Sequence, residues 1–369
     1  NAWMQYPVGM EFDPDQMRNV MTDFSAVALS PVAVNKFFHA VFSTWTLAGV
    51  FVVGVSAWLL WRKRNVEAAR LSLKIGTWVG LAGIVLTLWT GDGSAVNVAR
   101  VQPMKLAAME GLYDGKVGQE LVGFGFVNTD KKPGDNLPAI HAEISIPYGL
   151  SVLANHDPNS FVPGINDLIK GVSLTPQGDT INTVSYAERI SMGREAREAL
   201  AAYSTARKSG DESAAATALK TLRDNYKYFG YGYFDEPADA VPPVATTFYS
   251  FRVMVITGGY LLLLFVMLIF VYYRKPEFLE KPWLHWVCII SIPLVWICSQ
   301  AGWVLAEVGR QPWTIQDLLP VQAAVSAIPS GNVVLTFCLF ALLFTMLLAA
   351  EISIMLRYIS RKSKTNIME

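Results

Sequence analysis

The chain has 369 residues, of which 52% are hydrophobic and only 16% are charged, and its mean hydropathy is +0.33. This composition is typical of a membrane protein that also carries a polar part. The 30 basic and 30 acidic residues give zero net charge, which argues against a nucleic acid or another polyanion as partner. The 3 cysteines lie within apolar runs, which argues against a disulfide framework.

Five apolar stretches are long enough to cross a bilayer, which takes about 20 residues each. They lie near residues 33–61, 73–91, 248–273, 282–306 and 331–357. The sequence therefore predicts an all-α integral membrane protein with five transmembrane helices. It predicts three parts: an outer connecting segment and two transmembrane helices (1–91), a large polar insert (92–247), and three transmembrane helices with a cytoplasmic C-terminus (248–369).

Basic residues predict the orientation of these helices. The segments WRKRNVEAAR, YYRKPEFLEK and RYISRKSK follow the first, third and fifth stretches, whereas 1–32 and 307–330 carry few basic residues. Basic segments face the cytoplasm in most membrane proteins. We therefore expect the insert on the outer face.

Two helical features are predicted inside the insert. VQPMKLAAMEGLY reads as a short helix with Pro103 in its first turn. The stretch EAREALAAYSTARKSGDESAAATALKTLRDNY is interrupted by SGDES, which predicts a helical hairpin.

The segment AGWVLAEVGRQPW, residues 301–313, ends the fourth apolar stretch with a carboxylate and a guanidinium. Trp303, Glu307 and Arg310 follow one another at i, i+4 and i+7 and share one helix stripe. One interpretation is an interfacial helix end with an aromatic belt and a surface ion pair. The other is a functional site near the outer face.

His39 and Met254 each lie about six residues inside a predicted span, so we expect them at matching depth. An imidazole and a thioether on two helices are the axial ligands of low-spin haems with a raised potential. The alternatives are a core histidine bonded to a carbonyl and a methionine that only fills space.

Several stretches together resemble one family, subunit I of the cytochrome bd-type ubiquinol oxidases. The resemblance runs through NAWMQYPVG, KFFH, the GDGS turn, VQPMKLAAME, ISIPYGLSVLANHD, FRVMV and GWVLAEVGRQPW. The length of the insert resembles the long form of the family's quinol-binding loop, the Q-loop. The resemblance also implies further spanning helices before Asn1, which carry the haem d ligand.

The resemblance implies that His39 and Met254 are the axial ligands of a low-spin haem b, with Arg252 nearby. Arg252 and Met254 are two residues apart, about 200° around a helix, so one face cannot present both. We expect Arg252 to reach a haem propionate by extending along the helix.

The resemblance further implies that Glu307 ligates a high-spin haem b. Trp303 and Arg310 would then pack around the haem pair.

The resemblance assigns quinol binding to Lys105 and Glu110, and to Gln102. Lys105 and Glu110 are five residues apart and diverge by about 140° on a straight helix. We therefore expect at least one of them to be structural.

The implied function is quinol oxidation at the outer face, with electrons passing through the two haems b to haem d for reduction of oxygen to water. The implied partners are quinol, oxygen, membrane lipid, a second membrane subunit and a small single-helix subunit. The implied location is the bacterial cytoplasmic (inner) membrane with the Q-loop on the periplasmic side.

Two alternatives remain open from the residues themselves. A haem-free transporter or channel subunit could use intramembrane Glu and His as a proton relay. A non-catalytic haem b subunit could transfer electrons without reducing oxygen.

Overall fold

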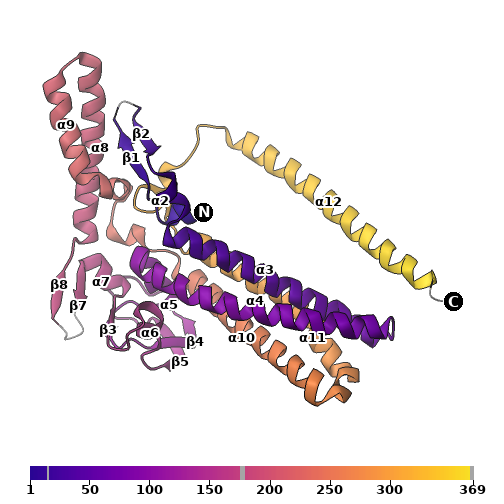
Figure 1. The fold of residues 1–369 in the computed structure, drawn as a ribbon. Coiled ribbons are helices and arrows are strands. Elements are labelled where there is room, and N and C mark those ends of the chain that lie inside the picture. Colours follow the sequence, from indigo (N-terminus) through magenta and orange to yellow (C-terminus); the bar gives the residue numbers. More distant parts are fainter. Residues whose placement is uncertain (15, 175–178, 366–369) are drawn as a thin grey trace. The chain divides into compact units, whose positions relative to one another are not determined.

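The computed structural model describes residues 1–14, 16–174 and 179–365, and it is mainly α-helical (Figure 1). Its five long helices are apolar enough to cross a membrane, which confirms the predicted fold class. They are α3 (Pro31–Trp61), α4 (Val66–Val101), α10 (Val244–Arg274), α11 (Pro282–Val308) and α12 (Ser330–Thr365).

The other elements are short, apart from one helical hairpin. The shorter α-helices are α1 (Ala2–Gln5), α2 (Phe24–Ala28), α5 (Pro103–Glu110), α6 (Gly149–Asn155), α7 (Ile165–Lys170), α8 (Tyr186–Ser209) and α9 (Glu212–Asn225). The 3-10 helices are η1 (Tyr226–Tyr233), η2 (Pro237–Ala240), η3 (Pro276–Glu280) and η4 (Val321–Ala323).

The strands form two-stranded antiparallel sheets that pair β1 with β2, β3 with β6, β4 with β5, β7 with β8 and β9 with β10. Their bounds are β1 (Met10–Asp13), β2 (Arg18–Met21), β3 (Lys116–Val117), β4 (Leu121–Val127), β5 (Ile140–Ile146), β6 (Phe161–Val162), β7 (Val172–Leu174), β8 (Thr180–Asn182), β9 (Trp313–Ile315) and β10 (Leu319–Pro320).

Four of the long helices form a bundle (Figure 1). Helix α3 packs against α4 and α11, and α10 packs against the same two helices. Consequently α3 and α10 occupy diagonal corners of the bundle, with α4 and α11 between them.

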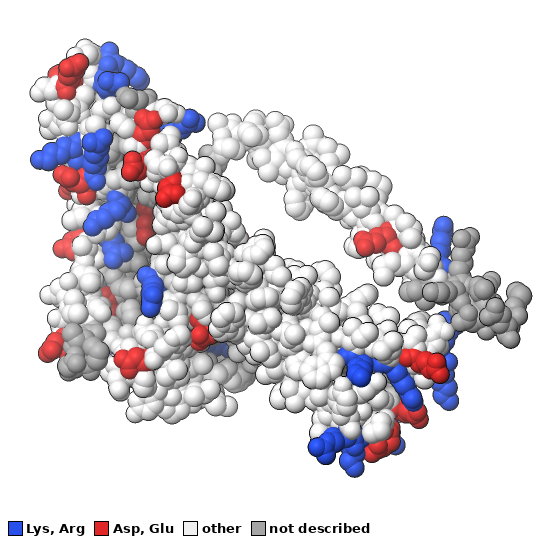
Figure 2. Space-filling model, viewed as in Figure 1, with Lys and Arg blue, Asp and Glu red and all other residues white. Residues whose placement is uncertain are grey.

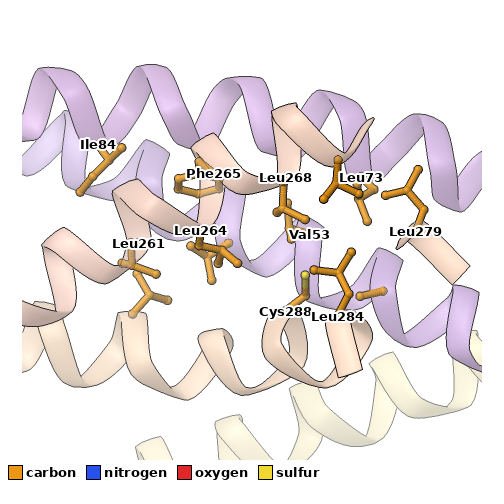
Figure 3. Close-up of a cluster of buried hydrophobic side chains, with 14 residues drawn as sticks. Val53, Leu73, Ile84, Leu261, Leu264, Phe265, Leu268, Leu279, Leu284 and Cys288 are labelled. Atoms are coloured by element: carbon orange, nitrogen blue, oxygen red, sulfur yellow. The ribbon is translucent and has the colours of Figure 1, made fainter. Parts of the chain in front are cut away.

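One half of the bundle has a dense apolar core, built from buried side chains of all four helices and of η3 (Figure 3). Gly49 and Gly80 let α3 and α4 approach closely, because a Cβ on Gly49 would collide with the Gly80 backbone. The buried cluster comprises Val50, Val53, Ala57, Leu73, Ile84, Leu261, Leu264, Phe265, Leu268, Val271, Leu279, Leu284, Cys288 and Val295.

Helix α4 runs ten residues beyond the apolar stretch that predicted it. The GDGS segment at 91–94 was expected to be a turn, and this expectation was wrong because the segment lies inside α4. Its polar groups find partners without leaving the helix. Ser94 Oγ donates to the Thr90 carbonyl (3.0 Å) and accepts from the Asn35 amide (2.7 Å), and Asp92 lies 3.0 Å from His156.

The insert contains the two predicted helical features. Helix α5 begins at Pro103, and α8 and α9 form the hairpin, with the break at Gly210 and Asp211. Ser185 and Glu188 form a capping box at the start of α8, and Asp211 caps α9. These local signals explain why the sequence predicted both features.

Charged side chains gather at the two ends of the first unit, residues 1–323, and leave a band of the helical bundle without them (Figure 2). One end is the insert, and the other carries the loops after α3 and α10. This distribution fits helices that cross a membrane.

The second unit, residues 324–369, consists in its described part mainly of α12. Its apolar stretch Ser330–Tyr358 is long enough to cross a bilayer.

Candidate functional site

Helix α5 lies where the insert meets the bundle, and it packs against α4, α7 and α10. It starts with Pro103 and is capped at its C-terminus by Gly111, whose φ of +63° favours glycine. Every residue from Met104 to Glu110 is buried, including a lysine and a glutamate. Buried charges are rare unless they are paired, so their partners matter.

Glu110 forms a buried ion pair with Arg252 of α10. The Arg252 Nη2 lies 2.6 Å from the Glu110 Oε2, and the two side chains are 6% and 2% exposed. The same guanidinium donates to the carbonyls of Val122 and Met109, and it lies 3.7 Å from the centre of the Phe248 ring. Sequence reasoning missed this pairing and expected a haem propionate as the partner of Arg252.

The Glu110 carboxyl has an unusual environment. Burial raises its pKa to about 7, against the opposing effect of Arg252. Its second oxygen, Oε1, accepts no hydrogen bond from the described residues. The carboxyl is therefore buried, and its Oε1 remains able to accept a hydrogen bond.

Lys105 points away from Glu110, towards the end of α11. Its Nζ lies 3.4 Å from the carbonyl oxygen of Ala306. Burial lowers the Lys105 pKa to about 7, and repulsion from Lys36 adds to the effect. The predicted divergence of Lys105 and Glu110 on the helix is confirmed.

Glu307 and Arg310 form the ion pair that their spacing suggested. The Arg310 Nη2 lies 2.5 Å from the Glu307 Oε2, and the side chains are 13% and 21% exposed. Asn1 donates to the other Glu307 oxygen, and Arg310 also donates to the Thr314 carbonyl. The pair is mostly buried, unlike the surface pair of the interfacial interpretation. The Trp303 indole, by contrast, is 62% exposed.

His39 of α3 is held by Thr90 of α4, with 3.0 Å between Nδ1 and the Thr90 Oγ1. The Thr90 hydroxyl donates its single proton to carbonyls of its own helix, those of Leu86 and Thr87. The Thr90 oxygen must then accept from Nδ1–H, which leaves the lone pair on Nε2. This is how a histidine is prepared to ligate a metal.

Met254 lies on α10, the diagonal partner of α3. A Cβ on Gly302 would approach the Met254 Sδ to 3.0 Å, so this glycine lets the sulfur lie against α11. One turn along α10, a Cβ on Gly258 would meet no heavy atom of the described residues within 4 Å. Arg252 leaves the helix on another side, as the two-residue spacing predicted.

A cavity that opens to solvent lies beside α5. Gln102 and Lys105 line it, and Glu110 does not. On its other side lie residues that sequence reasoning missed: Tyr186, Arg189, Tyr231, Gln316 and Asp317. A single Asp in TIQDLLP carries no sequence signal that distinguishes it from the surface acids of the insert.

The geometry can be compared with known proteins. The family model described as cytochrome bd terminal oxidase subunit I matches residues 1–363. The "Cytochrome bd-II ubiquinol oxidase subunit 1" of Escherichia coli K12 is 34% identical over 358 residues, which cover 97% of this chain and 68% of that protein. The "Cytochrome bd ubiquinol oxidase subunit 1" of Bacillus subtilis 168 is 28% identical over 98% of this chain and 63% of that protein.

A solved structure, that of the bd oxidase from Geobacillus thermodenitrificans, has a similar fold, with a TM-score of 0.65 at 23% identity. The likeness covers 98% of this chain and 65% of that one. The chain thus spans about two thirds of the length of the relatives it matches.

The buried pair gives a first prediction. Arg252→Met should destabilise the protein by about 3–5 kcal/mol, because Glu110 would lose the charged partner it has among the described residues. Without Arg252 the pKa of Glu110 should rise further above 7, so the folded variant keeps a proton that the unfolded chain has already released, and the loss should grow from pH 6 to pH 8. Thermal unfolding in detergent at the two pH values measures this.

One control variant tests whether Glu110 causes the pH dependence, and a second tests the cost of breaking an exposed ion pair. Adding Glu110→Gln to Arg252→Met should remove the pH dependence. Arg70→Met breaks the exposed Arg70–Glu280 pair and should cost at most about 1 kcal/mol. An equal loss in Arg70→Met and Arg252→Met would contradict the role given to the buried pair.

Proposed function

The chain belongs to the cytochrome bd terminal oxidase subunit I family, and from this membership we propose that it is the haem-bearing subunit of a membrane quinol oxidase. Quinol is oxidised on the outer face, and oxygen is reduced to water. The observation that carries the proposal is the cavity beside α5, where Lys105 and Gln102 meet. The partners are quinol, oxygen, lipid, a second membrane subunit and a small single-helix subunit.

The cavity suits a quinol headgroup. Its lining combines apolar side chains, such as Met104 and Trp313, with a few polar groups, as small-molecule sites do. With a pKa near 7, the Lys105 amine is partly neutral at physiological pH, so it can accept a proton from a quinol hydroxyl. The Gln102 amide can orient the ring by hydrogen bonding. Glu110 lies off this cavity, and in this proposal it anchors α5 through Arg252.

The bundle suits haem. When bound, two haems b and haem d supply the one-electron chemistry that connects quinol to oxygen. His39 would hold the low-spin haem b through Nε2, since Thr90 keeps Nδ1 occupied. Met254 would supply the second ligand, and the unfilled side of Gly258 one turn away leaves room beside it.

Glu307 would ligate the high-spin haem b. A carboxylate oxygen has two lone pairs, so a hydrogen bond to each oxygen leaves capacity for a ligand. Arg310 would balance the carboxylate charge in apolar surroundings. Trp303, exposed in the described chain, would pack against the macrocycle.

The quinol site can be tested through Lys105. Lys105→Met should lower kcat/KM for quinol about 10- to 150-fold, the effect of losing one charged hydrogen bond of about 1.5–3 kcal/mol. The haem spectrum should stay unchanged. Lys116→Met, at an exposed ion pair of the insert, is the matched control and should keep normal kinetics. Normal kinetics in Lys105→Met would place quinol elsewhere.

The low-spin haem can be tested through His39 and its hydrogen-bond partner. A reduced-minus-oxidised spectrum of the purified oxidase should lose its sharp b band in His39→Ala. Thr90→Val should weaken haem retention about 10- to 100-fold, because the imidazole loses its orienting partner. Thr77→Val is the control, since among the described residues its hydroxyl donates to its own helix, at the Leu73 carbonyl.

The same spectrum separates the alternatives. Wild-type protein without haem bands would indicate the transporter, and b bands alone would indicate the electron-transfer subunit. A further far-red chlorin band would support the oxidase.

Glu307 has its own test. Glu307→Ala should remove the high-spin b signal and oxygen consumption while the low-spin band remains, because the two ligand sets lie on different residues. Arg310→Lys should rescue Arg310→Ala only partly, since an ammonium lacks the planar fork of a guanidinium. Full haem content and turnover in Glu307→Ala would restore the interfacial interpretation of this helix end.

A further inference from the structure

The cavity beside α5 has a second polar wall that the proposed quinol contacts do not use. This wall consists of Gln316 and Asp317, from the loop between β9 and β10, and of Tyr231 and Arg189 from the insert. Elements more than 80 residues apart in sequence meet here, since the Tyr231 hydroxyl donates to the Asp317 Oδ1 at 2.8 Å.

A continuous chain of hydrogen bonds connects the two walls. The Gln102 Nε2 donates to the Gln316 Oε1 (3.0 Å), and the Gln316 Nε2 donates to the Asp317 Oδ1 (3.0 Å). Beyond Asp317, the Arg189 Nη1 donates to the Tyr231 hydroxyl (3.1 Å). Both hydrogen bonds that the described residues donate to this carboxylate end on Oδ1, which leaves Oδ2 to a group in the cavity that Asp317 lines.

The surroundings of Asp317 make it the member of this chain that can exchange a proton. Burial raises the pKa of Asp317 above its usual value. Burial also raises the Tyr231 pKa well above 10, so this phenol stays protonated and keeps donating. The guanidinium of Arg189, stacked 5.5 Å from the centre of the Tyr231 ring, remains a cation that favours the carboxylate.

We propose that Asp317 accepts one of the two protons released when quinol is oxidised in this cavity. The step deepens the proposed function and rests on it. One quinol O–H bond breaks, and its proton forms an O–H bond with the Asp317 Oδ2. The other proton goes to the neutral Lys105 amine, and the two electrons pass to the haems of the proposed oxidase. Quinol thereby becomes quinone, and both acceptors later release their protons to water.

The backbone at Asp317 permits a clean test. Its φ of +61° is left-handed, a conformation that Asp and Asn both tolerate. Asp317→Asn therefore keeps the shape and the acceptor for Tyr231 while removing the base. The variant should lower kcat for quinol oxidation about 100-fold or more, the size of a lost general base. KM for quinol and the haem spectrum should change little.

Two further measurements separate a proton acceptor from a structural residue. Wild-type activity should fall as the pH drops through the pKa of Asp317, and Asp317→Asn should lose this acidic limb. Other titratable or charged side chains also border the cavity: Lys105, Tyr186, Tyr231, Arg189 and Arg310. The pH profile of Lys105→Met is therefore measured alongside, to identify the limb that belongs to Lys105.

Added formate, a small carboxylate, should restore activity to Asp317→Ala, and Asp317→Glu should retain most of it.

The outcomes distinguish this inference from the proposed function. Wild-type kcat in Asp317→Asn, or a loss that formate and Asp317→Glu leave unrestored, would overturn the role of Asp317. The quinol oxidase itself would stand in either case. Wild-type protein with haem but without quinol oxidation would instead refute the proposed function.

Discussion

Helix α5 carries two buried charged side chains, and the position of the helix depends on the partners that these side chains need. Glu110 is paired with Arg252 of α10, and Lys105 reaches the Ala306 carbonyl at the end of α11. A buried charge that loses its partner costs several kcal/mol, so α5 is held in a single position between the two helices. The insert is thereby fixed to the bundle at its first helix, and the cavity beside α5 gets a defined wall.

The bundle divides into two halves with different physical character. The half around Phe265 and Leu268 is filled mainly by apolar side chains. In the half around His39 and Met254, polar groups are positioned by hydrogen bonds such as that from His39 to Thr90. An apolar half gives a stable scaffold in lipid, and the other half can then hold ligands at fixed positions.

Features set by local sequence were predictable. Hydropathy over about 20 residues showed the five spans, Pro103 and Gly111 marked α5, and the SGDES break marked the α8–α9 hairpin. The GDGS segment misled because glycine is usually a turn signal. In α4 its neighbours Asn35 and His156 supply the contacts that keep it helical.

Long-range pairings were not predictable from one sequence. Glu110 and Arg252 are 142 residues apart, and Tyr231 and Asp317 are 86 apart. Sequence periodicity relates residues of the same helix or strand. These residues lie on different elements, which meet only in the folded chain. The resemblance supplied candidate roles for Lys105, Glu110 and Gln102, but only the geometry separates Lys105 and Gln102 at the cavity from Glu110 at the anchor.

The position of the cavity suits a reaction whose products must leave in different directions. In the proposed oxidation, electrons move into the bundle, where His39 and Glu307 lie. Protons move to Lys105 and Asp317, on the side of the insert. Proton acceptors need contact with water, whereas haem ligands in lipid need a dry and rigid setting. The cavity satisfies both requirements, because both proposed proton acceptors line it and it opens to solvent, whereas the proposed haem ligands lie on the helices of the bundle.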